Sequence, residues 1–218
     1  MHKTWMWAGF LLIGVGALAS ASAGAQVAAA VGAVSRTDVA GSLYGAFSKT
    51  TAGNNTTQSP SNAAGGLLEV RYIRNPIVGF EGTYAFNRAN QTYRFTIPPS
   101  CPVNAPNCGG PTPISANAHE VTGDWVASLK VANLRPFALA GAGILFNQPS
   151  GGQANTNSAT KPVFVYGAGL DWGVLPHLGL RFQYRGNLYK SPDLTTLFTS
   201  VNAFTHTAEP MIGAYFRF

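Results

Sequence analysis

Most of the ionisable side chains stand in apolar stretches, at spacings of two or four residues. Glu69 and Arg71 are two residues apart, and Arg181 and Arg185 are four apart. On an extended strand these spacings place side chains on one face. Opposite charges on one interior face pair with each other, which is structural chemistry rather than catalysis. We therefore predict an interior ionic network of Glu69, Arg71, Glu81, Glu120, Asp124, Lys130, Asp171, Arg181, Arg185, Glu209 and Arg217.

Specific pairs follow from the order of these residues along neighbouring strands. The expected pairs are Arg185 with Glu209 and Asp171 with Arg181. Glu81 is expected opposite or diagonal to Arg71 and Glu69, depending on the register. A carboxylate left without its partner in such an interior is strongly destabilising, so replacing Arg185 by Met should lower the refolding yield.

Two histidines are the strongest candidates for catalysis. His206 stands between two threonines, and His119 precedes Glu120. Neighbours on a strand point to opposite faces, and no serine lies two residues from His206, so no nucleophile is placed within reach of a base. We expect no catalytic residue and no cofactor, and therefore no enzyme.

The two cysteines, Cys101 and Cys108, lie in the Pro/Asn-rich stretch "CPVNAPNC". A local disulfide within one loop fits an oxidising compartment. A metal site would need more ligands, and His119 is the only nearby candidate, so we expect no metal site.

Charged residues make up only 10% of the chain, against the quarter or so usual in soluble domains. The formal net charge is +6, but the basic residues form no cluster, so nucleic-acid binding is not indicated. A protein with so few charged residues must shield apolar surface from water in some way other than burying it in an ordinary core.

The first residues, "MHKTWMWAGFLLIGVGALASASAGAQ", combine a lysine, an apolar run and small residues. They indicate a secretory signal peptide over residues 1–25, with an uncleaved anchor as the alternative. A short N-terminal periplasmic segment over residues 26–36 and a single barrel domain over residues 37–218 should follow.

Stretches with apolar residues at every second position recur through the rest of the chain, without a sustained helical period. They predict eight strands, at residues 39–48, 66–74, 77–87, 119–132, 137–146, 162–174, 178–189 and 205–218. The connections between them alternate strictly between long and short.

This pattern is typical of an all-β fold, an eight-stranded antiparallel up-and-down transmembrane β-barrel with long extracellular loops. The apolar row of each strand should face lipid and the charged row the interior, because a midplane Arg or Lys facing lipid costs about 2 to 4 kcal/mol. A soluble lipocalin-like barrel shares the period of two, but it would turn the apolar face inward.

Two stretches fit this pattern less well. In residues 137–146 the polarity contrast is weak, and we expect Ala138, Ala140 and Ala142 to face the interior beside Gly167 and Gly169. Pro210 lies within the last strand and cannot donate to a ladder, so a bulge or irregular start is expected there.

The chain ends in "PMIGAYFRF", and "RPFALAGAGILF" and "GLRFQYRG" occur earlier. With these motifs the chain resembles the small eight-stranded outer-membrane barrels of the OmpA-like, OmpX-like and opacity-protein group. The resemblance implies the outer membrane of a Gram-negative-type bacterium, with its lipid and lipopolysaccharide as surroundings. It also implies a C-terminal signal for the barrel-assembly machinery, carried by Ile212, Tyr215, Phe216 and Phe218.

An interior plugged by ion pairs predicts a structural or surface-interaction protein that meets an extracellular ligand through its loops. The alternative is a narrow pore or conduit for small apolar molecules, for which the small residues along one wall would leave room. A lipopolysaccharide-modifying enzyme is the third interpretation, and the isolated histidines argue against it.

Overall fold

The computed structural model describes residues 36–75, 77–97, 100, 110–152 and 154–218. The expected signal peptide, the segment up to residue 35 and both cysteines lie outside the described residues. Among the residues that are described, no helix is long and apolar enough to cross a membrane.

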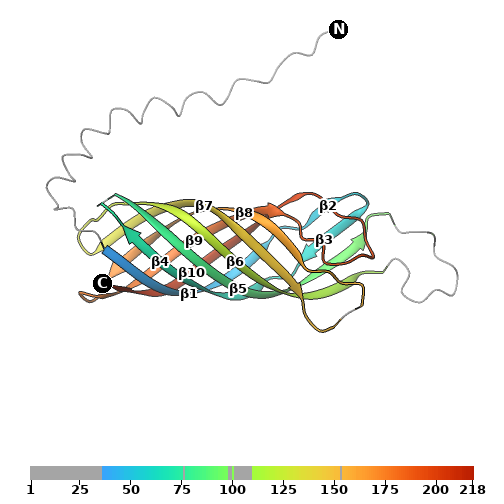
Figure 1. Ribbon diagram of the computed structural model, residues 1–218, viewed down its shortest axis with the longest axis horizontal. Helices are drawn as coiled ribbons and strands as arrows, with labels where there is room; N and C mark the ends of the chain where they lie inside the picture. The colour runs from blue at the N-terminus through green and yellow to red at the C-terminus, as the bar shows by residue number, and fades with distance from the viewer. Residues whose placement is uncertain (1–35, 76, 98–99, 101–109, 153) are drawn as a thin grey trace, which may run out of the picture.

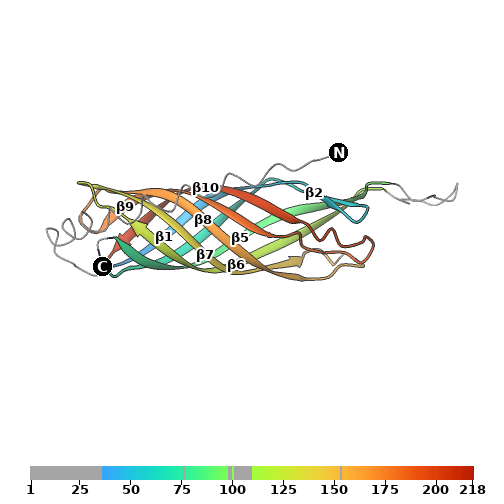
Figure 2. The same ribbon diagram turned by 90° about the horizontal axis from the view of Figure 1, so that it is seen from above.

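Eight long antiparallel strands form a closed barrel (Figure 1 and Figure 2). They are β1 (Arg36–Ser48), β4 (Ala63–Ile73), β5 (Val78–Phe95), β6 (Thr112–Ser128), β7 (Leu134–Pro149), β8 (Ala159–Gly173), β9 (Leu178–Lys190) and β10 (Phe204–Arg217). Each strand pairs with its neighbour in the chain, and the β1–β10 ladder joins the first strand to the last. The predicted all-β, eight-stranded barrel is confirmed.

The two ends of the barrel differ in their connections. The chain terminus after β10 lies at the end where the connections after β4, β6 and β8 are short (Figure 1). The long connections lie at the opposite end. In outer-membrane barrels short turns face the periplasm and long loops the outside, so these are the periplasmic and the extracellular end.

The side-chain pattern is the reverse of that in a soluble protein. Large apolar side chains face outward and are exposed on the isolated barrel, with Leu43 at 73%, Leu68 at 63% and Trp125 at 61%. The interior instead buries Arg71 and Arg181 completely. Aromatic residues gather at both edges of the outer apolar band, as in membrane barrels. They include Tyr72, Phe80, Trp172 and Phe216 at the periplasmic edge and Phe47, Phe86, Phe146 and Phe204 at the extracellular edge.

Strand β7 departs from the expected orientation. Ala138, Ala140 and Ala142 face outward, whereas Phe137 and Leu139 point into the interior, so the predicted wall of inward alanines is wrong. The interior needs bulk at this level, because the Arg71 guanidinium lies 4.0 Å above the centre of the Phe137 ring. Gly169 on β8 makes the room, since a Cβ there would collide with that ring.

At the extracellular end the strands are longer than the sequence indicated. Strands β5 and β6 pair as far as Tyr93 and Thr112. The first long connection holds a further hairpin, β2 (Thr51–Gly53) and β3 (Thr56–Pro60), whose second strand pairs with β5. Asn54 and Asn55 turn this hairpin with positive φ angles of 48° and 58°, which asparagine tolerates better than most residues.

Pro210 interrupts one ladder without producing a bulge. The β10–β9 register runs through Pro210 and Tyr184 unbroken. The β10–β1 register stops at Met211–Tyr44 and resumes at Ala208–Phe47 with the same offset. The predicted bulge is therefore wrong, because the missing N–H costs hydrogen bonds on the β1 side only and shifts no residue.

Candidate functional site: the lumen of the barrel

A dense group of ion pairs fills the periplasmic half of the lumen. We call Glu69, Arg71, Glu81, Asp171 and Arg181 the lower network. Arg71 Nε lies 2.5 Å from Glu81 Oε2, and Arg181 Nε lies 2.7 Å from Asp171 Oδ1. In both pairs the two residues face each other in neighbouring strands. The arginines also cross-link the pairs, with Arg181 3.2 Å from Glu69 and Arg71 3.4 Å from Asp171.

A second group contains Arg185, from β9, at mid-lumen. Its Nη2 lies 3.3 Å from Glu120 Oε1 and 3.7 Å from Asp124 Oδ2. Glu209 stands opposite Arg185 in the β9–β10 register. Within the described residues, however, the carboxylates that come within ion-pair distance of Arg185 are those of Glu120 and Asp124 rather than Glu209.

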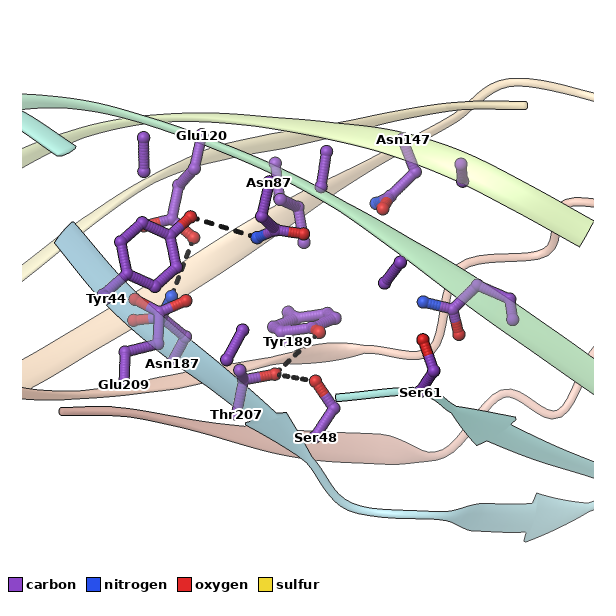
Figure 3. A pocket seen from close by; sticks show the side chains of 17 residues that line it. Tyr44, Ser48, Ser61, Asn87, Glu120, Asn147, Asn187, Tyr189, Thr207 and Glu209 are labelled. Carbon is purple, nitrogen blue, oxygen red and sulfur yellow. Dashed lines mark hydrogen bonds between the residues drawn. The ribbon is translucent and has the colours of Figure 1, made fainter. Parts of the chain in front are cut away.

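A small polar cavity of about 30 Å³ lies beside Glu120 and Glu209 (Figure 3). It is on the extracellular side of Arg185, because Asn187 and Tyr189, which follow Arg185 along β9, line it. We call it the upper cavity. Glu120 and Glu209 line one end of it, and Asn187 Nδ2 donates to Glu120 Oε2 at 2.9 Å. Tyr44 accepts a hydrogen bond from Asn87 at 3.0 Å, and Tyr189 shares one with Thr207 at 2.9 Å. A cavity of this volume has room for about two waters.

The connection between β9 and β10, residues 191–203, covers the extracellular mouth of the lumen, and we call it the lid. Leu194 is completely buried. The Tyr93 hydroxyl donates to Pro192 O at 2.6 Å and accepts from Leu194 N at 3.2 Å. Gln58 of the added hairpin also donates to Pro192 O, at 3.3 Å. Hydrogen bonds from two strands therefore hold the lid down over the upper cavity.

The periplasmic end of the lumen opens into a wider cavity of about 310 Å³, which we call the vestibule. Charged residues line it, namely Arg36, Lys130, Arg135, Asp171 and Arg217. Asp38 stands nearby, with Arg36 Nη2 2.5 Å and Arg217 Nε 3.8 Å from its carboxylate. Arg135 donates to Ser128 Oγ at 3.4 Å.

At the vestibule the sequence analysis placed one residue wrongly and did not single out three others. Lys130 was expected inside the ionic network, but β6 ends at Ser128 and Lys130 is exposed in the turn that follows, so that prediction is wrong. Arg36, Asp38 and Arg135 were not predicted. Asp38 precedes the outward Val39, so strict alternation along β1 would have placed it inside.

A sequence model of the family described as "Outer membrane protein beta-barrel domain" matches residues 13–208. The chain belongs to the outer-membrane β-barrel protein family. Its location in the outer membrane of a Gram-negative bacterium and its likeness to the OmpA-like barrels follow from this match and from the fold. No curated protein matches the chain.

Solved structures share the fold at low sequence identity. Ail of Yersinia pestis, solved with the heparin analogue sucrose octasulfate, is 19% identical with a TM-score of 0.52, over 84% of this chain and 99% of Ail. Neisserial surface protein A is 13% identical with a TM-score of 0.54, over 84% and 97%. OprG of Pseudomonas aeruginosa is 9% identical with a TM-score of 0.56, over 85% and 97%. Identities this low establish the barrel and leave its role open.

The two histidines lie on the outer wall of this membrane barrel. The His206 ring shares a hydrogen bond with the Tyr166 hydroxyl at 3.0 Å, and His119 shares one with Tyr84 at 2.8 Å. Both pairs sit near the extracellular aromatic edge. A polar group on an aromatic ring at this depth suits the membrane interface, where one end is apolar and the other wet.

Proposed function

We propose that the protein is a closed outer-membrane barrel that acts as a structural or surface-interaction protein through its extracellular connections. The observation that carries this proposal is the filling of the lumen at two levels. The lower network fills the periplasmic half of the lumen. The lid, held by Tyr93 and Gln58, covers the mouth above the upper cavity. An eight-stranded barrel is narrow enough for its own side chains to fill it.

Planar-bilayer conductance tests closure against the narrow-pore alternative. Protein that shows the heat-dependent gel shift of a folded barrel is expected to give no stable unitary openings. The same recording on a variant without the lid contact, Tyr93→Phe, should also stay silent, because the lower network still blocks the lumen. Stable openings of the unmodified protein would refute the closed barrel and favour the pore.

The charge of the extracellular end supports an anionic ligand. Above the apolar band the described residues include Lys49, Arg88, Arg94, Lys161 and Lys190, against the single carboxylate of Asp193. Arg88 and Arg94 are exposed and lie on the outward face of β5. Ail, which shares the fold, was solved with a sulfated sugar. We infer that the extracellular partner of this chain also carries negative groups, such as sulfated or phosphorylated glycans.

Binding of sucrose octasulfate to the refolded barrel tests the anionic ligand. The double variant Arg88→Ala/Arg94→Ala is expected to lose at least tenfold in affinity, and binding by the unmodified protein should weaken with salt. Arg74→Ala is the matched control, because it removes an exposed positive charge at the periplasmic end and lies outside the vestibule. Equal losses in both variants would show that only net charge matters and would refute a specific extracellular site.

We also propose that lipopolysaccharide and the barrel-assembly machinery are partners. The outward positions of Ile212 and Phe216 on the last strand, and the exposure of Phe218 just after it, support a role in assembly, since another protein can reach them before the barrel closes. Tyr215 points inward and is buried. Enzymatic activity is not part of the proposal, because His206 and His119 are each bonded to a tyrosine on the lipid-facing wall.

A further inference from the structure

The vestibule gathers positive charge far beyond what its carboxylates balance. Four cationic side chains line it, those of Arg36, Lys130, Arg135 and Arg217, with one carboxylate, that of Asp171. Asp171 belongs mainly to the lower network, at 2.7 Å from Arg181, and its other oxygen lies 3.8 Å from Arg36 Nη2. Asp38 is the other acid close by, and its nearest cation is Arg36. The vestibule is thus left with a surplus of positive charge.

The arginines of the vestibule are close enough to repel one another. Arg135 lies within electrostatic range of both Arg36 and Arg217, and these two act on each other as well. Like charges held together at a protein interior are unfavourable unless an anion offsets them. The fold places them on β1, β7 and β10, so no local turn or helix forces the three together.

Several donors in this group also lack an acceptor. Nε of Arg36, Nε of Arg135 and Nε of Arg217 are buried and have no hydrogen-bond partner within the described part of the chain. Arginine presents a planar fork of donors that matches the oxygens of phosphate and carboxylate groups. Each arginine also donates within the protein, to Asp38, Ser128 or Tyr215. Three arginines with donors left over suit an oxyanion better than a neutral ligand.

The size and openness of the vestibule complete the argument. A volume of about 310 Å³ falls at the lower limit of small-molecule sites, about 300 to 1,000 Å³. The vestibule lies at the short-turn end, so a soluble ligand enters from the periplasm. The lower network closes it on the other side.

We propose that the vestibule is a periplasmic binding site for a phosphate-type oxyanion, either inorganic phosphate or the phosphate of a small phosphomonoester. Arg135 supplies forked donors from β7, Arg36 and Arg217 supply them from the neighbouring strands β1 and β10, and Lys130 supplies a further charge from the rim. The site goes beyond the extracellular role proposed above, because it lies at the other end of the barrel.

Phosphate binding to the full barrel in a non-ionic detergent tests the site. Line broadening in ³¹P NMR is expected to show saturable binding of inorganic phosphate and of glycerol 3-phosphate. Binding to the native barrel should also raise the unfolding midpoint in phosphate relative to chloride at equal ionic strength. Vesicles of phosphatidylglycerol should not displace the bound phosphate, because a headgroup held in the bilayer does not reach inside the rim.

Variants separate this site from general attraction of anions. Arg135→Gln should abolish saturable binding, and Lys130→Ala should weaken it about tenfold while the barrel folds normally, since Lys130 is exposed in a turn. Arg74→Gln, which removes an exposed positive charge from another turn at the same end, is the control and should bind as the unmodified protein does. Absence of saturable binding, displacement by the vesicles, or equal binding by Lys130→Ala and the unmodified protein would each overturn the proposal.

Discussion

The two ends of the lumen both contain arginines and carboxylates, but positive charge is in excess at one end and negative charge at the other. At the periplasmic end arginines outnumber carboxylates around an open vestibule. In the upper cavity Glu120 and Glu209 lie near one cation, Arg185, which pairs with Glu120 and Asp124, and the lid lies above them. Between these regions the lower network matches each arginine to at least one carboxylate at short range. The balanced ion pairs that block the lumen therefore lie in the middle of the barrel, whereas the unbalanced charges that could bind a ligand lie at its ends.

The largest expected effect comes from breaking the matched middle. Arg181→Met removes the cation that contacts Asp171 and Glu69. It leaves the buried Glu69 without an ion-pair partner among the described residues, and Asp171 with the longer contact to Arg71. We expect a loss of about 3 to 5 kcal/mol in the free energy of unfolding, measured by urea titration of the folded barrel. Gln183→Met, two residues away on the same face, is the control. The amide atoms of Gln183 have no partner among the described residues, so its replacement should cost little.

Arg185→Met tests the acidic end. It leaves Glu120, Asp124 and Glu209 without their shared cation, at a cost of about 3 kcal/mol. The deficit should shrink at acid pH, because protonated carboxyls need no counter-charge. Unfolding of both proteins over a range of pH measures this difference. A deficit that stays constant down to acid pH would mean that the loss comes from packing rather than charge.

Tyr93→Phe tests how firmly the lid is held. The variant leaves Pro192 O and Leu194 N without the hydroxyl that they contact. We expect a loss of about 1 to 2 kcal/mol in the local opening free energy of residues 191–203. Hydrogen exchange of these amides reports it, with Tyr84→Phe on the outer wall as the control. Unchanged exchange would show that packing of Leu194, not the hydroxyl, keeps the lid closed.

The smallest effect is expected at the exposed edge of the lid. Lys161 Nζ lies 3.1 Å from Asp193 Oδ2, and both side chains are partly exposed. Lys161→Ala should change stability by about 0.5 kcal/mol or less, and high salt should remove the difference. Thermal unfolding at two salt concentrations provides the measurement. A loss comparable to that of Arg185→Met would contradict the distinction drawn between the matched interior and the exposed ends.

Within the lipid-facing band the sequence was sufficient to assign strands and faces, except for the faces of β7. There the outward row is apolar and the inward row charged, so residues such as Leu68 and Glu69 identify their own sides. Above the band the outward row is no longer apolar and the inward row is no longer charged. On β5 the outward residues become Arg88, Asn90 and Arg94, whereas Tyr93 points inward, so the alternation no longer resembled a membrane strand. The extracellular extensions and the hairpin β2–β3 were therefore missed.

Other parts of the lumen depend on contacts that no local pattern records. Phe137 faces inward because Arg71, distant in sequence, stacks on it. Leu194 lies in a connection without periodicity, and its burial depends on Tyr93 from another strand. Hairpin geometry predicted the register that places Glu209 opposite Arg185. The side chain of Arg185 nevertheless turns toward Glu120 and Asp124. The periodicity of the sequence predicts on which side of the barrel wall a residue lies, whereas packing in three dimensions determines which residues it contacts.

The gap in the ladder at Pro210 bears on how the barrel closes during folding. The β1–β10 seam joins strands from opposite ends of the chain, such as Val39 with Phe216, so it has the greatest loop-closure cost of any strand pair. With the ladder broken beside Pro210, the seam consists of two separate hydrogen-bonded stretches, and neither can propagate into the other by adding one bond at a time. Sealing of the barrel is thus expected to need two nucleation events, and Pro210→Ala should merge them and make the last step of folding faster.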